Sequence, residues 1–157
     1  MVLRRVHSSA RSLPATVEWI DEISVDRYRP MLRLLSRDDL RFLRDQPDYS
    51  PRMEAKLRVQ RAQIFADYLK RMSEDFSRIC GALKLLTLQA DRDRPDLAAQ
   101  IVQAQFAFIR GMYLARVNVL LYRVGIGSVD AAALLRIFSS MHIELQGLVP
   151  ATGAAMA

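Results

Sequence analysis

Apolar residues recur at steps of three and four along the middle of the chain. Seven of them form the first such row: Phe65, Leu69, Met72, Phe76, Ile79, Leu83 and Leu86. Because this spacing returns side chains to one face of a helix at every turn, it predicts a helix packed along a partner. A second helical pattern follows the charged turn Asp91-Arg92-Asp93-Arg94-Pro95. We therefore expect a long antiparallel helical hairpin over residues 51–124.

Start and stop signals bound the two helices. Ser50-Pro51 combines a hydroxyl N-cap with a proline at the first helical position, where its missing N–H costs nothing. Pro95 opens the return helix, and Gly125 ends it after Val124. A first helix of about forty residues would be about 60 Å long. Either the bundle is elongated or the helix bends, and we place such a bend at Cys80-Gly81.

Shorter helical patterns flank the hairpin. Three of them lie between residues 17 and 45, and the last opens with a capping-box pattern at Ser36 and Asp39. After the hairpin, Ser128 is placed to cap a final helix that ends near Leu148. The predicted fold is all-α: an elongated helical bundle built on the antiparallel hairpin, with short N-terminal helices and a C-terminal helix.

One domain accounts for the chain. With 157 residues, 51% of them apolar and 25% charged, the composition is that of a folded soluble protein. We place the bundle domain at residues 18–149, between a basic flexible tail at 1–17 and a small-residue flexible tail at 150–157. The uncharged run at residues 97–109 is shorter than the about 20 residues that a membrane span needs, so we expect no transmembrane helix.

The net charge of +6 is unevenly distributed. Residues 1–17 carry three arginines and no acid, and residues 18–26 carry four acids and no base. Residues 27–61 carry ten bases against five acids, which gives +5. Arginine forks bind phosphates and carboxylates, although the interleaved acids also fit an ordinary solvated face. The candidate anion-binding residues are Arg4, Arg5, Arg11, Arg33, Arg37, Arg41 and Arg44.

The basic tail at residues 1–17 has three interpretations. It lacks the apolar centre of a secretory signal, but its acid-free, Ser- and Arg-rich composition is typical of transit peptides and of membrane-surface arms. We favour a plain disordered tail because the segment is short. The expected location is cytoplasmic, with peripheral contact to a membrane as the alternative.

The return helix carries the main functional lead. Small residues recur along it at Ala104, Ala107, Gly111 and Ala115, which lets a neighbouring backbone approach closely. From Leu114 to Val124 it is apolar nearly all round, as expected for a helix surrounded by its own short helices or by another chain. The candidate interface residues are Phe106, Gly111, Leu114, Val117, Leu121 and Tyr122.

Charged residues on this helix need partners if they are buried. With the turn centred near Asp93, Arg110 falls beside Asp75, and Arg116 falls within reach of Asp67. We therefore expect two structural salt bridges across the hairpin, Arg110–Asp75 and Arg116–Asp67.

Residues for catalysis or metal binding are few. The two histidines, His7 and His142, lack the spacing of a metal site, and Cys80 fits a buried apolar position. The Gly125-Ile-Gly127 sequence follows a helix rather than a strand, so we interpret it as a helix-to-helix turn and not as a dinucleotide motif. No nucleophile–base pair can be assembled, and we expect neither an enzyme nor a cofactor.

Three functions follow from these patterns. The first, which we favour, is a non-enzymatic scaffold or interaction protein that buries the return helix in a homo-oligomer or against a protein partner. The second is anion binding through the Arg-rich N-terminal part, at a membrane surface rather than on nucleic acid, because no nucleic-acid motif accompanies the arginines. The third is a small-ligand pocket inside the bundle, lined by Tyr68, Tyr113, Asn118 and Tyr122.

Overall fold

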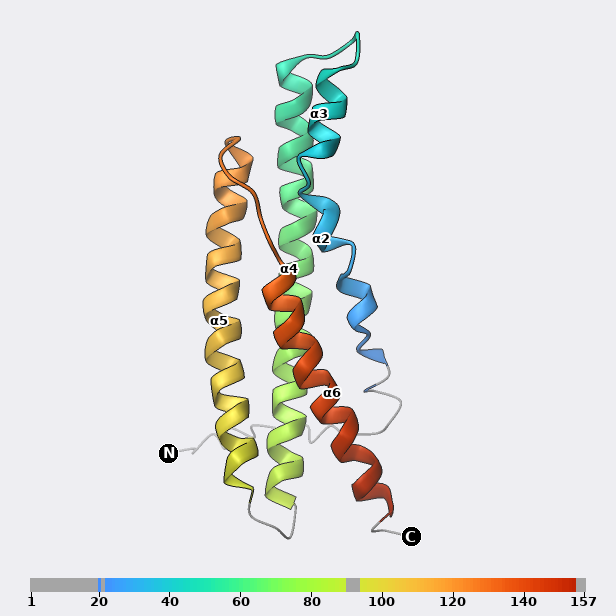
Figure 1. The fold of residues 1–157 in the computed structure, drawn as a ribbon, viewed down its shortest axis with the longest axis vertical. Helices are drawn as coiled ribbons and strands as arrows, with labels where there is room; N and C mark the ends of the chain where they lie inside the picture. The colour runs from blue at the N-terminus through green and yellow to red at the C-terminus, as the bar shows by residue number, and fades with distance from the viewer. Residues whose placement is uncertain (1–19, 21, 90–93, 155–157) are drawn as a thin grey trace, which may run out of the picture.

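The computed structural model describes residues 20, 22–89 and 94–154, and every regular element within them is helical (Figure 1). The expected all-α bundle with a long helical hairpin is confirmed. In chain order the elements are the 3₁₀-helix η1 (Val25–Tyr28) and the α-helices α2 (Met31–Leu34), α3 (Asp38–Arg44), α4 (Pro51–Gln89), α5 (Pro95–Arg123) and α6 (Ala132–Ala154).

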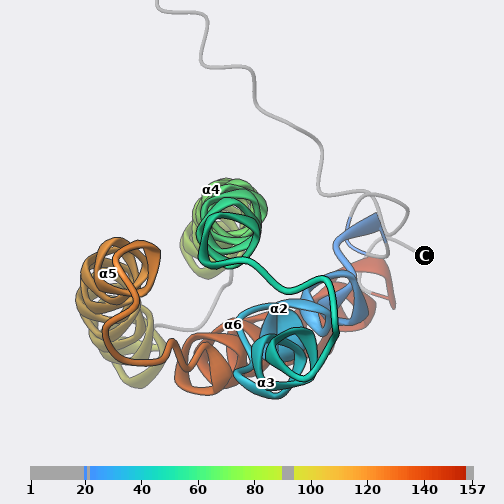
Figure 2. The ribbon, with the colours of Figure 1, turned by 90° about the horizontal axis from the view of Figure 1, so that it is seen from above.

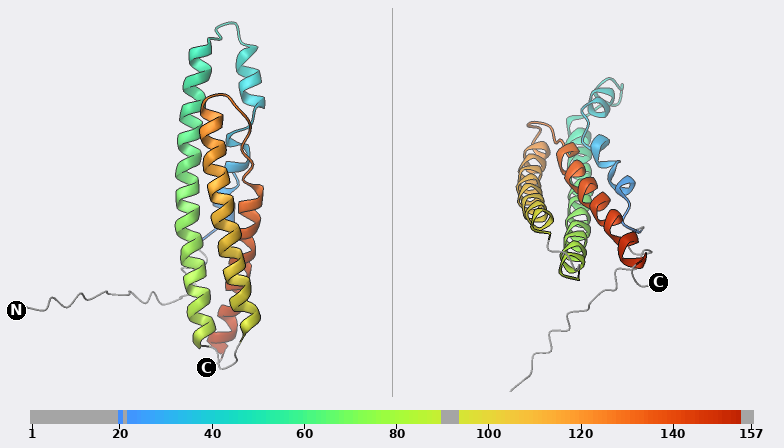
Figure 3. Two further views of the ribbon diagram at one scale, coloured as in Figure 1. Left: turned by 90° about the vertical axis from the view of Figure 1, so that its left-hand side faces the viewer. Right: turned by 60° about the horizontal axis from the view of Figure 1, so that its bottom comes forward.

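Three long helices make the body of the bundle. α4 and α5 run antiparallel along each other, and α6 packs against both of them. Seen from above, α5 lies at one edge of the bundle, and α2 and α3 overlap α6 in this view (Figure 2). The first turns of α4 extend beyond the end of α5, where α3 accompanies them (Figure 3). One face of α5 is therefore left without a neighbouring helix among the described elements.

Helix α4 begins as the sequence predicts. The Met53 backbone N–H donates to the Ser50 Oγ at 3.2 Å, and Pro51 occupies the first helical position. The helix then continues without interruption through Cys80-Gly81 to Gln89. Of the two alternatives for this long helix, the structure has the elongated bundle, and the helix does not end or restart at the glycine.

The hairpin core matches the predicted row. Six of the seven row residues in α4 are buried, and Leu86 is partly buried. Phe76 stacks on Phe108 of α5 with ring centroids 3.8 Å apart and planes at 11°. The residues that α5 contributes to this core also recur at helical steps: Leu97, Ile101, Phe108, Met112, Ala115, Val119 and Tyr122.

Polar contacts fasten the N-terminal segment to the bundle. The Tyr28 hydroxyl donates to Asp75 Oδ2 at 2.6 Å, and the Tyr28 ring packs edge-on against Phe138 of α6 at 5.2 Å. Burial and the bond to the Asp75 carboxylate raise the pKa of Tyr28 well above its usual range. His142 of α6 bonds to the Ile20 carbonyl at 3.1 Å. Asp75 and His142 are thus buried polar groups with structural partners.

Two helix caps differ from the prediction. The Asp38 N–H donates to Ser36 Oγ, but Asp39 pairs with Arg61 at 2.8 Å, so the reciprocal half of the capping box is not made. At α6, the Ala132 N–H donates to Asp130 Oδ1 at 2.8 Å, and Asp130 therefore takes the capping role expected of Ser128. An Asp side chain reaches the N–H two residues on as readily as Ser does.

The two predicted tails, at residues 1–17 and 150–157, are described to different extents. The tail at 1–17 lies outside the described residues, and so do Arg4, Arg5 and Arg11. At the other end, α6 continues to Ala154, into the segment expected to be a flexible tail. Within the described ranges, none of the helices is both long and apolar enough to cross a membrane.

Candidate functional site

Helix α5 carries two apolar faces. Its inner face is the core row described above, and its outer face is a second row of exposed apolar residues that we call the outer stripe. At about 100° per residue, the two rows lie about 140° apart around the helix. The outer stripe consists of Val102, Phe106, Ile109, Tyr113, Val117, Leu120 and Val124.

The outer stripe is large for a free surface. Phe106, Tyr113 and Val124 are each about 70% exposed, at 71%, 70% and 69%. If each of the seven side chains exposes about 100 Å², the stripe presents on the order of 700 Å² of apolar surface. The largest patch on a typical monomer is about 300–600 Å², and a standard protein interface buries about 800 Å² on each partner. The stripe is therefore of interface size.

Charged residues flank the outer stripe without entering it. At about 100° per residue, Arg110 lies about 60° to one side of the stripe, and Arg116 and Arg123 lie about 60–80° to the other. All three are exposed, and none of them forms an ion pair with another described residue. The stripe itself is uncharged along its whole length.

The predicted interface residues divide between the two faces. Phe106 and Val117 belong to the outer stripe, and Leu114 and Leu121 are exposed at its edge. The assignment of the other two needs correction, because both face inward. A Cβ on Gly111 would meet Leu134 of α6 at 2.7 Å, and Tyr122 is buried at the end of the hairpin core.

The two expected salt bridges across the hairpin, Arg110–Asp75 and Arg116–Asp67, do not form in this structure. Asp75 lies on the side of α4 that faces the N-terminal segment, where Arg27 approaches it at 3.9 Å. Arg110 and Arg116 point to the outer side of α5 instead. Asp67 is exposed and accepts a long bond of 3.5 Å from the Gln63 side chain. The arginines are solvated rather than buried, so they need no partner.

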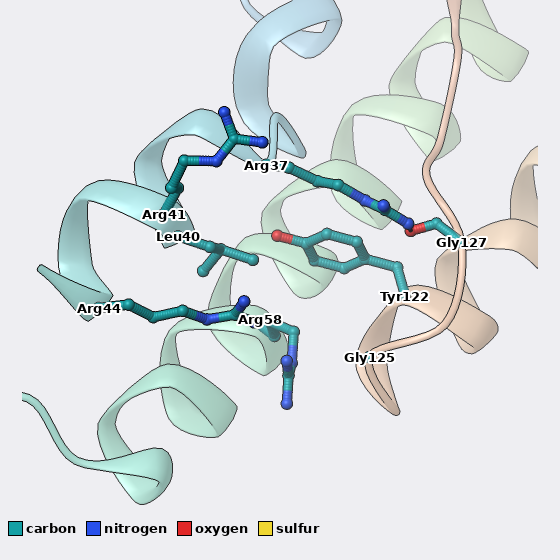
Figure 4. A pocket seen from close by; sticks show the side chains of 8 residues that line it. All are labelled: Arg37, Leu40, Arg41, Arg44, Arg58, Tyr122, Gly125 and Gly127. Atoms are coloured by element: carbon teal, nitrogen blue, oxygen red, sulfur yellow. Dashed lines mark hydrogen bonds between the residues drawn. The ribbon is translucent and has the colours of Figure 1, made fainter.

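A second feature lies where α3, α4 and the α5–α6 connection meet. There a cavity of about 240 Å³, which we call the arginine pocket, opens between the three segments (Figure 4). Four guanidinium groups, one tyrosine, one leucine and two glycines line it: Arg37, Leu40, Arg41, Arg44, Arg58, Tyr122, Gly125 and Gly127.

Glu54 anchors two of these arginines. Its carboxylate, only 3% exposed as a residue, accepts two bonds from Arg44 at 2.7 and 2.9 Å and one from Arg58 at 2.7 Å. The Tyr49 hydroxyl donates a fourth bond at 2.7 Å. The bonds from Arg44 and Tyr49 lower the pKa of Glu54 from 4.5 to about 2, so the carboxylate stays ionised. This cluster holds α3 and the turn after it against α4.

The α5–α6 connection closes the other side of the pocket. Arg37 donates to the Gly127 carbonyl at 2.9 Å, which ties α3 to this connection. Gly125 adopts a left-handed φ of 86°, and a Cβ there would lie 3.2 Å from the Arg58 guanidinium. Glycine therefore suits both the turn and the close approach of Arg58.

The pocket brings together three of the seven predicted anion-binding residues, Arg37, Arg41 and Arg44. Arg33 is exposed on α2 and does not line the pocket. The contribution of Tyr122 was not predicted, because it comes from a helix about eighty residues further along the chain. The glycines after α5 were the only local signal of a tight turn at this place.

The tyrosines expected to line a pocket inside the bundle do not meet. Tyr113 lies on the outer stripe, Tyr122 reaches the arginine pocket, and Tyr68 packs against Tyr28 at 6.4 Å. Tyr68 also borders a surface hollow of about 390 Å³ beside Arg27 and Arg71. In the part of the chain that the structure describes, no group of His, Cys, Asp and Glu residues is arranged to hold a metal ion.

No protein-family model matches the chain, and no curated protein or solved structure is detectably similar to it. The outer stripe and the arginine pocket are therefore the features from which a function is inferred.

Proposed function

We propose that this protein is a helical interaction module that pairs through the outer stripe of α5 with a second copy of the same chain. The observation that carries the proposal is the size and spacing of the stripe. An uncharged apolar row of about 700 Å² on an exposed helix loses unfavourable contact with water when a partner covers it.

The spacing of the stripe indicates a helical partner. Its successive steps are four, three, four, four, three and four residues, from Val102 to Val124. Rows that alternate between steps of three and four are the seams at which two helices interlock their side chains. A partner helix could therefore pack against the outer stripe in the way that α4 packs against the inner row.

The same spacing favours a second copy as the partner. The steps read identically from either end and are centred on Tyr113. An antiparallel pair with Tyr113 on its two-fold axis would therefore set Phe106 of each copy against Leu120 of the other, and Val102 against Val124. A two-fold interface needs one surface that is complementary to itself, and a palindromic stripe meets this condition.

The flanking arginines are compatible with the antiparallel direction. In the antiparallel pair, the side of the stripe that carries Arg110 faces the same side of the other copy, whose helix runs in the opposite direction. Arg110 then lies near Leu114 and Val117 of the other copy, and like charges do not meet directly.

Light scattering on a sizing column tests the proposal. We expect the wild-type protein to be a dimer at micromolar concentration and Tyr113→Glu to be a monomer, because the substitution sets two carboxylates together at the two-fold axis. Ile64→Glu is the matched control, since it also charges an exposed apolar position but lies on α4. It should remain dimeric, and circular dichroism should give equal helix content for all three proteins.

Other outcomes contradict the proposal. A wild-type monomer at all accessible concentrations would remove the second copy as the partner. If that monomer bound vesicles of anionic lipid and Tyr113→Glu abolished the binding, the stripe would be a membrane-contact surface instead.

A further inference from the structure

The arginine pocket has a surplus of positive charge. Four guanidinium groups line it, and among the described residues only Glu54 forms an ion pair with them, which leaves three positive charges without a paired carboxylate there. The neighbouring Arg61–Asp39 pair adds no net charge. Arg37, Arg41 and Arg44 are exposed, so water screens part of their mutual repulsion, and an anion bound among them would remove the rest.

Buried donors in and beside the pocket lack acceptors. The Tyr122 hydroxyl, Arg58 Nε and Arg61 Nη1 are inaccessible to solvent and have no hydrogen-bond partner of good distance and angle among the described residues. Burial raises the pKa of Tyr122, and the Arg61 guanidinium, which lies close to the hydroxyl, lowers that pKa by less. Tyr122 is only 2% exposed as a residue, and its side chain projects into the middle of the pocket (Figure 4). A buried polar group without a partner costs stability, so an anion that entered the pocket and reached these atoms through a small side-chain shift would gain their bonds.

The ion pairs with Glu54 leave part of each guanidinium free. Arg44 uses Nε and Nη2, and Arg58 uses Nη1, so each retains N–H groups for a ligand. The Arg41 side chain, which also lines the pocket, forms no bond with another described residue. Glu54 therefore positions two arginines without saturating them.

We infer that the arginine pocket binds a small phosphate-bearing anion, a phosphomonoester or a diphosphate. A phosphate group offers three or more acceptor oxygens and close to two negative charges, which matches converging guanidiniums and a tyrosine hydroxyl better than the two oxygens of a carboxylate do. Arginine forks bind such oxygens in pairs. The cavity of about 240 Å³ is below the about 300–1,000 Å³ of drug-sized ligand sites, so the ligand is small.

Calorimetric titration with glycerol 3-phosphate tests the inference, with acetate at equal ionic strength as the reference anion. We expect binding of glycerol 3-phosphate and much weaker binding of acetate. Arg41→Ala should weaken the phosphate affinity about tenfold, because it removes a charge-assisted donor. Arg33→Ala is the matched control, since it removes an exposed arginine from α2, outside the pocket, and should leave the affinity unchanged.

Tyr122→Phe distinguishes ligand binding from a structural role. Without ligand, this variant should be as stable as the wild type or more so, because it removes a buried hydroxyl for which the described residues offer no well-formed hydrogen bond. With glycerol 3-phosphate, it should bind about fivefold more weakly and gain less thermal stability than the wild type. A variant that is destabilised without ligand and binds glycerol 3-phosphate normally would contradict the role given to the hydroxyl.

Two sources of phosphate remain to be separated, a soluble metabolite and a lipid headgroup. Binding of glycerol 3-phosphate in solution would assign a soluble ligand. Binding only to vesicles that contain phosphatidic acid, lost in Arg41→Ala, would assign a headgroup. If neither probe binds better than acetate or plain phosphatidylcholine vesicles, or if Arg33→Ala has the effect of Arg41→Ala, the inference is wrong.

This inference does not depend on the outer stripe. Tyr113 lies on the outer face of α5 and does not line the pocket. The variant Tyr113→Glu should therefore keep the phosphate affinity while it loses dimerisation, so the two proposals can fail separately.

Discussion

The inner and outer faces of α5 have the same chemistry and different surroundings. Both are rows of aromatic and aliphatic residues at steps of three and four, and they lie on one helix. The inner row is covered by α4 and α6, whereas the outer row is exposed along its whole length. The difference teaches that apolar spacing locates a packing surface but does not say which molecule covers it.

The largest difference between the two faces should appear when one phenylalanine on each face is replaced by alanine. Phe108 is buried and stacked on Phe76, so Phe108→Ala should lower the free energy of unfolding by about 3–5 kcal/mol. Phe106→Ala removes the same atoms from an exposed position and should cost less than about 0.5 kcal/mol in the monomer. Denaturant unfolding at low protein concentration measures both, and equal losses would contradict the assignment of the two faces.

An intermediate effect is expected at the close contact between α5 and α6. Gly111→Leu forces a side chain against Leu134, where even a Cβ would lie at 2.7 Å, and such overpacking costs about 1–3 kcal/mol. Gly81→Leu is the control, because no atom lies within 4 Å of a Cβ at that exposed helical position. The control should be neutral or stabilising in thermal unfolding. A neutral Gly111→Leu would show that this side of α5 is open.

The smallest effect should be at Glu54, where ion pairs and hydrogen bonds rather than apolar contacts hold α3 against α4. The folded-state pKa of Glu54 is lowered from 4.5 to about 2, so the folded protein binds fewer protons there than the unfolded chain. The stability that Glu54 contributes is then complete above about pH 4.5 and is lost as the pH falls towards 2. Arg44, one of its partners, is largely exposed, which limits the effect.

Thermal unfolding of wild type and Glu54→Gln across this pH range measures that contribution. The wild type should have the higher Tm at neutral pH, and the difference should shrink below about pH 4.5. A difference in Tm that stays constant down to pH 2 would mean that the carboxylate is not the group that titrates.

The local parts of the fold could be predicted because local residues determine them. Ser50-Pro51 fixes the start of α4 through one side-chain bond, and the row from Phe65 to Leu86 fixes its buried face. The register was also close, since a turn near Asp93 sets Phe76 almost opposite Phe108. These features need only the helical period and a short connection.

The rotation of α5 about its own axis, which decides the face that it turns towards α4, could not be predicted in the same way. Its two apolar rows are equivalent in sequence, so nothing local identifies the one that faces α4. Arg110 was therefore expected beside Asp75, and Gly111 at an interface, although the helix turns Arg110 outward and Gly111 towards Leu134. The outer residues Ile109, Tyr113 and Leu120 were missed for this reason.

The arginine pocket shows the same limit over a longer distance. The spacing of Arg37, Arg41 and Arg44 indicated a basic face on a short helix. Their convergence with Tyr122 and Gly125 depends on the return of α5 to the side of α3, which only the tertiary fold determines. A basic face is common, and the buried hydroxyl of Tyr122 is what distinguishes this one.

Disulfide trapping tests the antiparallel pairing of the outer stripe most directly. Phe106→Cys and Leu120→Cys are prepared separately and mixed under mild oxidation, while the native Cys80 is buried and its pKa is raised to about 11 by that burial. The account predicts a mixed dimer linked between positions 106 and 120. Dimers of Phe106→Cys alone should be rare, because the two cysteines would be about 20 Å apart along the helices. Absence of the mixed dimer, or equal yields of all pairings, would contradict the account.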